Sequence, residues 1–228
     1  PAQVVNIADM NRISTREVLM DLHKAGLDSV LEDGADIFDL AIRRVICNPK
    51  ATGGQWLQVM REAHELGIPA GASMLYGHLE GPEEKVAHLM HLRDLQDETH
   101  SFTFYAPRAY RARGNGAGAS SALNVNSLVG GQEDLLEFAM GRIFLNDFPG
   151  IRCYANDLGM KTTQIALHFG VNSVVVLIND DEPVDEETRM AQGMPTMVQL
   201  RELVLRAGFR VTSASLSEGA PAPYPAQG

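Results

Sequence analysis

The chain has 228 residues, 45% of them hydrophobic, so it is long enough to bury one sizeable core. Its 19 Lys and Arg against 29 Asp and Glu give a formal charge of −10, which argues against a nucleic-acid or anionic-membrane partner. No apolar run approaches the roughly 18 residues that span a bilayer, and residues 1–9 lack signal-peptide features. We therefore expect a cytoplasmic protein.

The elements predicted along the chain alternate between strand and helix. Short apolar runs predict strands at residues 4–8, 27–31, 68–75, 102–106, 151–155, 171–178 and 209–212. Amphipathic stretches predict helices between them, with two long ones at residues 83–98 and 132–145.

Helix ends are marked by recurring residue types. Ser14 with Glu17, and Thr196 with Gln199, have the spacing of a capping box at a helix start. A glycine that can close a helix in the left-handed conformation follows each of four apolar stretches, at Gly26, Gly67, Gly170 and Gly208.

About six strand–helix units with helical crossovers predict an α/β fold with a mostly parallel sheet. A doubly wound sheet and a barrel both satisfy this pattern, and a barrel whose first strand lies at residues 4–8 would be incomplete. We expect one domain over residues 1–212, with a mobile Gly-rich loop at 111–131 and a disordered tail at 213–228.

Ligands of parallel α/β folds meet the carboxyl ends of the strands, where this sequence places many polar residues. They are Asp9, Glu32, Asp33, Asp36, Tyr76, His78, Glu80, Arg108, Tyr110, Asn156, Asp157, Asn179, Asp180 and Asp181. Tyr76, His78 and Glu80 are the tightest cluster, because a phenol, an imidazole and a carboxylate beside a glycine suit polar ligand binding or proton exchange. The alternative is a helix start, because Pro82 and two glutamates follow.

His88 and His91 lie three positions apart, a spacing that puts both on one helix face. We favour a solvated face over a metal pair, because no third ligand is suitably placed. Only two cysteines occur, Cys47 and Cys153, which are 106 positions apart without a CxxC spacing. Reduced, buried thiols are the expectation for both.

Several long words of the sequence resemble one family, the radical-SAM aminofutalosine synthases of the futalosine route to menaquinone. AGLDSVLEDGADIF at 25–38 resembles the family's AGLDSLPGGGAEIF, and Arg43 follows in both. REAHELGIP at 61–69 and MLYGHLE at 74–80 resemble REAHxLGIP and MLYGHVE. HLMHLRDLQDET at 88–99 and RIFLNDFP at 142–149 resemble HLxxLRxLQDET and RLFLDNFP. Dehypoxanthine futalosine cyclase and the deazaflavin-precursor synthases are similar to a lesser degree, and the resemblance covers residues 3–212.

This resemblance implies an incomplete TIM-like (β/α) radical-SAM barrel that begins near the family's third strand. In that family, a CxxxCxxC motif after the first strand holds a [4Fe-4S] cluster that cleaves S-adenosylmethionine. The present sequence has two cysteines and no such motif, so we expect no cofactor in this chain. The resemblance further implies that Tyr76, His78, Glu80 and, less securely, Asp36 line a substrate cavity. It assigns no catalytic residue or metal ligand.

Departures from the family words concentrate at the predicted strand ends. The family's PGGGAE is replaced at residues 31–36 by LEDGAD, and its FIPLAF at 105–110 by YAPRAY. Helix words are kept better than these words, which is the pattern of a retained scaffold with an altered site.

The leading functional hypothesis is an aminofutalosine synthase-like transferase that joins an adenosyl radical to an enolpyruvyl-benzoate substrate, but is inactive as this chain alone. The alternative is a non-catalytic binding protein, either a homo-oligomer or the partner of a cluster-bearing chain, paired through open sheet edges. A shortened reading frame and a natural pseudoenzyme are both compatible with the sequence.

Overall fold

The computed structural model describes residues 1–46, 51–110, 129–176 and 195–212. Most of the predicted loop at 111–131, the whole predicted tail at 213–228 and the last two residues of the strand predicted at 171–178 lie outside these ranges. Cys47 and the strand-end residues 179–181 lie outside them as well.

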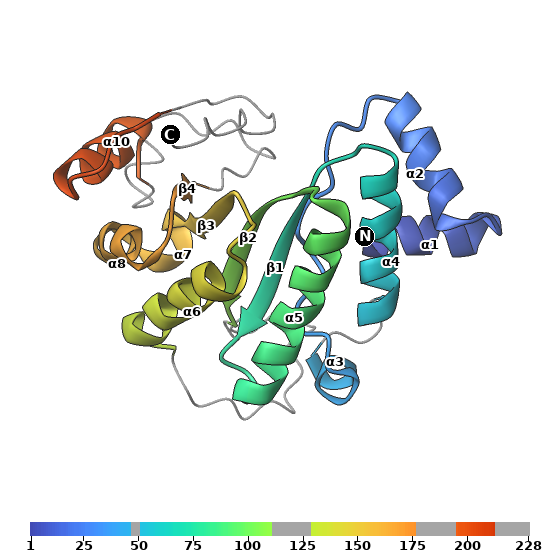
Figure 1. Cartoon of the computed structure of the whole chain (residues 1–228), viewed down its shortest axis with the longest axis horizontal. Coiled ribbons are helices and arrows are strands. Elements are labelled where there is room, and N and C mark those ends of the chain that lie inside the picture. Colours follow the sequence, from blue (N-terminus) through green and yellow to red (C-terminus); the bar gives the residue numbers. More distant parts are fainter. Residues whose placement is uncertain (47–50, 111–128, 177–194, 213–228) are drawn as a thin grey trace, which may run out of the picture.

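A four-stranded parallel sheet forms the centre of the described structure (Figure 1). Its strands stand in chain order, β1 (Ala70–Tyr76), β2 (Phe102–Ala109), β3 (Gly150–Tyr154) and β4 (Ser173–Val175). Helices α5 (Pro82–Thr99) and α6 (Gly131–Phe144) make the crossovers between the first three strands. The α/β fold with a parallel sheet predicted from the sequence is confirmed.

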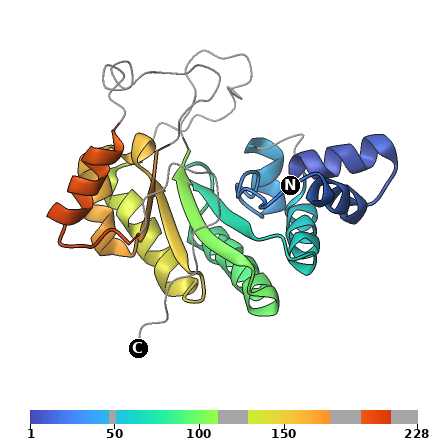
Figure 2. The same ribbon diagram turned by 90° about the horizontal axis from the view of Figure 1, so that it is seen from above.

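The remaining helices gather at the two ends of the sheet (Figure 2). Helices α1 (Ala2–Asn11), α2 (Thr15–Lys24), α3 (Leu40–Ile46) and α4 (Gly53–Glu65) lie at the β1 end. The β4 end has α7 (Ala155–Leu158), α8 (Met160–Ala166), the short 3-10 helix η1 (Leu167–Phe169) and α10 (Met197–Arg206). None of the helices in the described ranges is both long and apolar enough to cross a membrane.

One large core fills the space between the sheet and the helices, and it buries Trp56, Tyr105, Phe138 and Phe148 almost completely. A smaller apolar cluster on the other face of the sheet contains Phe104, Ala106 and Tyr154. Alternate residues of the strands thus point to opposite faces, as the two-residue repeat of a strand requires.

Three strand predictions need correction. Residues 4–8 are wrong as a strand, because they lie inside α1, where Val4, Val5 and Ala8 are buried on one helical face. Residues 27–31 contribute only a single parallel bridge, from Val30 to Ala70 of β1. No strand occurs at residues 209–212.

The predicted helix ends are confirmed. Ser14 and Thr196 both accept a hydrogen bond in complete capping boxes. The backbone φ angle is positive at each of the four glycines expected to close a helix, with values of 106° at Gly26, 75° at Gly67, 99° at Gly170 and 84° at Gly208.

The sheet is strongly curled. The Tyr154 hydroxyl at the end of β3 donates a hydrogen bond to the Glu32 carboxylate. Glu32 follows the segment that pairs with the outer edge of β1, so both β1 and β2 separate the two residues in the sheet. Neighbouring strands are roughly 4.8 Å apart, so a flat sheet would hold these two residues too far apart for contact. A curled parallel sheet with helices on its outer face is the wall of a partial TIM-like barrel.

Candidate functional site

The candidate site is the sheet face that α5 and α6 do not cover, which we call the inner face. Its side chains come from Ser73, Phe104, Ala106, Arg108, Arg152, Tyr154 and Val175, together with Glu32 from the loop beside β1. Arg108 and Tyr154 lie at the carboxyl ends of their strands, which is the edge where ligands bind in parallel α/β folds.

Further from the carboxyl ends of the strands, a guanidinium lies over an aromatic ring on the inner face. The Phe104 ring packs on the bare backbone of Gly71, where a Cβ atom would come within 2.3 Å of the ring. The Arg152 guanidinium lies 3.3 Å from the centre of that ring, and its Nε is 3.4 Å from Ser173 Oγ. A cation–π contact of this kind holds a positive charge in a partly desolvated place.

Nearer the strand ends, Tyr154 is surrounded by charged groups. Its hydroxyl donates to Glu32, and the Arg108 guanidinium lies 4.9 Å from the centre of its ring. Arg108 also donates two hydrogen bonds, of 3.0 and 2.9 Å, to the Asp157 carboxylate. Burial and the nearby Glu32 raise the pKa of Tyr154, so its phenol stays protonated at neutral pH.

Two of the departures from the resembling family therefore meet at one residue. Glu32, Arg108 and Asp157 were expected near strand ends, and the structure brings Glu32 and Arg108 to Tyr154, with Asp157 bound to Arg108. Arg152 and Tyr154 were missed as site residues, because they lie inside the strand predicted at 151–155 and only residues that follow a strand were considered. The signal that could have identified them is their two-residue spacing on β3, which places both on one face.

The predicted cluster of Tyr76, His78 and Glu80 forms the turn between β1 and α5. Tyr76 is 1% exposed, and its hydroxyl donates to Asp134 Oδ1 of α6 at 2.5 Å. Burial and this hydrogen bond raise the pKa of Tyr76, so the phenol stays protonated. The side chains of His78 and Glu80 are 0% and 2% exposed, so all three predicted residues lie inside the wall at the strand end.

The Glu80 carboxylate holds this turn together. It accepts hydrogen bonds from the backbone N–H groups of Gly77 and His78, at 2.5 and 2.8 Å, and contacts His78 Nδ1 at 2.8 Å. Burial alone would raise the pKa of Glu80, but the hydrogen bonds from His78 and Gly77 outweigh it and lower the pKa to about 2. Glu80 is therefore an ionised turn-forming group and does not supply a proton near neutral pH.

Lys85 of α5 connects this turn to α6. Its Nζ forms an ion pair with Glu137 and lies 3.6 Å from Glu80 and 3.8 Å from Glu133. Burial disfavours the charged form of Lys85, but these carboxylates, Glu137 above all, raise its pKa and keep it protonated. Lys85 is thus the cation that Glu80, Glu133 and Glu137 share.

Asp36 comes close to the same strand end through its backbone. Its carbonyl oxygen accepts a hydrogen bond of 2.7 Å from the N–H of Leu75, the residue before Tyr76. Asp36 has a positive φ of 44°, which is uncommon for a residue other than glycine. The structure thus brings the four predicted substrate residues to the end of β1.

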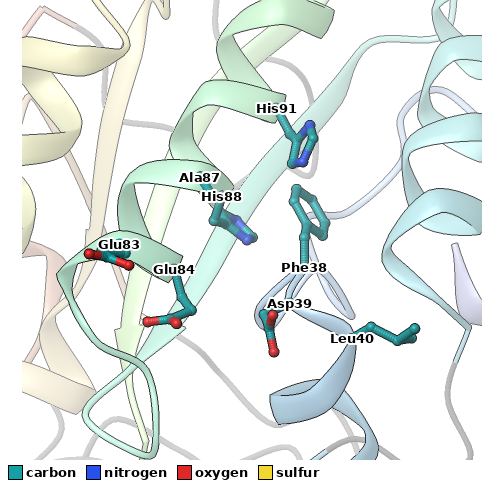
Figure 3. Close-up of a pocket in the computed structure, with 8 residues that line it drawn as sticks. All are labelled: Phe38, Asp39, Leu40, Glu83, Glu84, Ala87, His88 and His91. Atoms are coloured by element: carbon teal, nitrogen blue, oxygen red, sulfur yellow. The ribbon is translucent and has the colours of Figure 1, made fainter.

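A surface hollow of about 420 Å³ lies between the start of α3 and the first turns of α5. Figure 3 shows Glu83 and Glu84 on one side of it and Asp39 and Leu40 on the other. His88 at its base is 1% exposed, stacks on Phe38 at 4.0 Å between ring centres and has its Nε2 within 2.9 Å of the Ser73 carbonyl oxygen. Burial lowers the pKa of His88 to about 3, so its imidazole is neutral and buried rather than solvated as the sequence suggested.

The metal chemistry that the resemblance implies needs a cluster of ligating side chains. The described residues contain no group of three or more His, Cys, Asp or Glu side chains arranged to hold a metal ion. Cys153 is fully buried in the core that faces the helices, and burial raises the pKa of its thiol to about 12. Iron–sulfur clusters need thiolates, so this part of the chain does not fit a cluster.

Fold and inner face together define a partial (β/α) barrel with a polar site at its strand ends, and sequence comparison identifies its relatives. No protein-family model matches the chain. It is 36% identical over 212 residues to aminodeoxyfutalosine synthase of Thermus thermophilus, covering 91% of this chain and 55% of that protein. It is 38% identical over 182 residues to the 5-amino-6-(D-ribitylamino)uracil–L-tyrosine 4-hydroxyphenyl transferase of Methanoculleus marisnigri, covering 76% and 47%.

The transferase of the same name from Methanopyrus kandleri is 30% identical over 219 residues, covering 92% of this chain and 56% of that protein. The chain therefore spans about half the length of the curated relatives it matches. The resemblance to the radical-SAM aminofutalosine synthases is confirmed, and the chain is a relative of these enzymes and of the tyrosine transferases.

Proposed function

We propose that this chain forms the substrate side of a radical-SAM transferase of the aminofutalosine synthase kind. Such an enzyme joins an adenosyl radical to an enolpyruvyl-benzoate substrate. The observation that carries the proposal is the barrel wall itself, which is 36% identical to an aminodeoxyfutalosine synthase over 91% of this chain. Its inner face presents Arg108, Tyr154 and Glu32 at the strand ends. Guanidinium groups suit an anionic substrate, and the Tyr154 hydroxyl, whose proton goes to Glu32, can still accept a hydrogen bond from it.

Tyr76, His78, Glu80 and Asp36 remain our proposed substrate residues in this half of the cavity. Their polar atoms are held by protein partners, so their contribution is to fix the rim of the cavity at the end of β1. Tyr76 and Glu80 would do this through α6 and the turn, and Asp36 through its contact with Leu75.

The chemistry of this family is supplied by S-adenosylmethionine and a cluster bound to three cysteine thiolates. The 228 residues contain two cysteines, and Cys153 is a buried, protonated thiol. We propose that these residues alone do not cleave S-adenosylmethionine. The remaining ligands would come from elsewhere, either from a longer protein or from another chain.

Anaerobic reconstitution of the 228-residue chain with iron and sulfide, followed by a search for 5′-deoxyadenosine, tests this proposal. We expect none above the background of the buffer. The aminodeoxyfutalosine synthase of Thermus thermophilus, treated in the same way, is the positive control. Clear turnover by the isolated chain would contradict the proposal.

The second candidate function is a non-catalytic partner that supplies this barrel wall to a cluster-bearing chain. The observation that favours it is β4, which pairs only with β3 among the described residues and leaves its other edge open. Open edges of sheets are commonly covered by pairing. Analytical ultracentrifugation distinguishes the candidates, because a chain that stays monomeric and folded at all concentrations counts against pairing through this edge.

A further inference from the structure

The loop of residues 32–37 is held by its carbonyl groups. Every one of its six carbonyl oxygens accepts a hydrogen bond from outside the loop. The donors are Ser73 Oγ to Glu32, Trp56 Nε1 to Asp33, Arg43 to Gly34, Ala35 and Ile37, and the Leu75 N–H to Asp36, at distances from 2.6 to 3.1 Å. The backbone path of this loop is thus fixed from three directions, by β1, α3 and α4.

Arg43 makes half of these contacts. It is 4% exposed, and it also donates two hydrogen bonds, of 2.8 and 2.6 Å, to the carbonyl of Ala51. All the hydrogen bonds shown for Arg43 go to neutral carbonyls, so the energy of an ion pair does not explain why a cation is buried here. The five N–H donors of a planar guanidinium can reach four carbonyls in fixed directions, which an ammonium with three donors cannot do.

The loop needs such support because its backbone is strained. Gly34 has a φ of 83° and Asp36 a φ of 44°, and a left-handed residue other than glycine costs roughly 1–2 kcal/mol. Without external hydrogen bonds, the segment would relax to conformations with lower energy. That relaxation would move Glu32, whose carboxylate accepts the hydrogen bond from Tyr154 across the inner face.

We propose that Arg43 is a positioning residue of the inner face, which acts through the 32–37 loop to hold Glu32 against Tyr154. Arg43 contacts the carbonyl groups of the loop from α3, whereas Tyr154 contacts the side chain of Glu32 from β3. Calling Glu32 and Tyr154 substrate-side groups rests on the proposed function, whereas the mechanical coupling of Arg43 to their contact does not.

Trp56 reports on this loop directly. It is the single tryptophan of the sequence, and its indole N–H donates to the Asp33 carbonyl at 3.1 Å. In Arg43→Ala, we expect a red-shifted Trp56 emission and stronger acrylamide quenching, with the far-UV circular dichroism kept. Arg44→Ala is the matched control, since Arg44 is the exposed neighbour on the same helix and should leave the emission unchanged.

Chemical rescue distinguishes the contribution of the planar guanidinium geometry from that of its positive charge. Added ethylguanidinium should restore the Trp56 emission of Arg43→Ala, whereas ethylammonium at the same concentration should not. Should the alanine variant fail to fold, Arg43→Lys keeps the charge and is expected to show the same red shift. An unshifted emission in a folded Arg43→Ala or Arg43→Lys, or equal rescue by both cations, would overturn the proposal.

A double-mutant comparison tests whether Arg43 acts on Tyr154, which it does not touch. Tyr154→Phe removes one buried hydrogen bond and should lower the melting midpoint of the wild type by about 2–4 °C. In the Arg43→Ala or Arg43→Lys background, we expect the same substitution to have almost no effect. Additive losses would contradict the coupling. None of these readouts depends on turnover, so their failure and the failure of the proposed function are distinguishable.

Discussion

At the scale of single residues, Glu80 shows a side chain whose charge is needed by the fold. Its carboxylate accepts hydrogen bonds from the backbone N–H groups of Gly77 and His78, which have no other acceptor within the described part of the chain. The ionised form is thus bound more tightly in the folded protein than in the unfolded chain. Its pKa of about 2 lies below the value of about 4.3 in an unfolded chain.

We predict a pH-dependent loss of stability for Glu80→Gln. Because the folded pKa is the lower one, the charge stabilises the protein by about 3 kcal/mol above pH 5, and the contribution disappears as the pH falls towards 2. Urea unfolding should show the full difference from the wild type at pH 7 and about half of it at pH 3. Glu83→Gln, an exposed change three residues further on in the first turn of α5, is the control. An equally large, pH-independent loss for Glu80→Gln would refute the assignment.

At the scale of elements, the pair of Lys85 and Glu137 fastens α5 to α6. Their side chains are 14% and 1% exposed, so removing one partner leaves a buried charge without its counter-ion. Lys85→Met should destabilise the protein by roughly 3–5 kcal/mol. The double variant Lys85→Met/Glu137→Leu should recover most of the loss, as measured by urea unfolding. A double variant that is less stable than the single one would show that the pair itself, rather than the unpaired charge, is what counts.

The packing of β1 against β2 gives a second prediction at this scale. A Cβ atom at Gly71 would lie 2.3 Å from Phe104, whereas one at Gly54 in α4 would meet nothing within 4 Å. Gly71→Ala should lower stability by about 1–3 kcal/mol, because Phe104 must leave its place under Arg152. Gly54→Ala should raise it by up to about 1 kcal/mol. Thermal unfolding of both variants checks the opposite signs, and a neutral Gly71→Ala would show that Phe104 moves freely.

How far the sequence predicts these elements depends on what stabilises each of them. Capping boxes and helix-closing glycines are local, so Ser14, Thr196 and Gly170 could be identified from neighbouring residues. Residues 4–8 failed because two adjacent valines suit a strand locally, whereas their burial against α2 and α4 favours a helix. Tertiary packing decides such short apolar segments.

For the candidate site, the sequence predicts positions along the chain but not contacts across the sheet. Tyr76, His78 and Glu80 were recognised as one cluster because they are neighbours in one turn. The contact of Glu32 with Tyr154 joins residues 122 positions apart and depends on the curl of the sheet. Arg43 could be matched to a family word, but its carbonyl partners follow only from the path of the 32–37 loop.

At the scale of the whole molecule, the reactivity of the Cys153 thiol reports whether the core is closed. Its side chain belongs to β3 and packs in the core between the sheet and the helices. It is fully buried, and burial raises the pKa of its thiol to about 12. Only about one such thiol in 10,000 would be ionised at pH 8, and thiol reagents attack the thiolate. Labelling must therefore pass through opening of the core.

We predict that Cys153, studied in a Cys47→Ser variant, reacts with a thiol reagent only at the rate allowed by unfolding. Its labelling should be slow in buffer, rise with urea in step with the unfolding transition and fall when the core is stabilised by Gly54→Ala. Fast labelling without denaturant would contradict the buried core. Because iron also binds the thiolate, the opening that admits a thiol reagent would equally be needed for Cys153 to bind iron, so cluster assembly on this thiol should be no faster than unfolding.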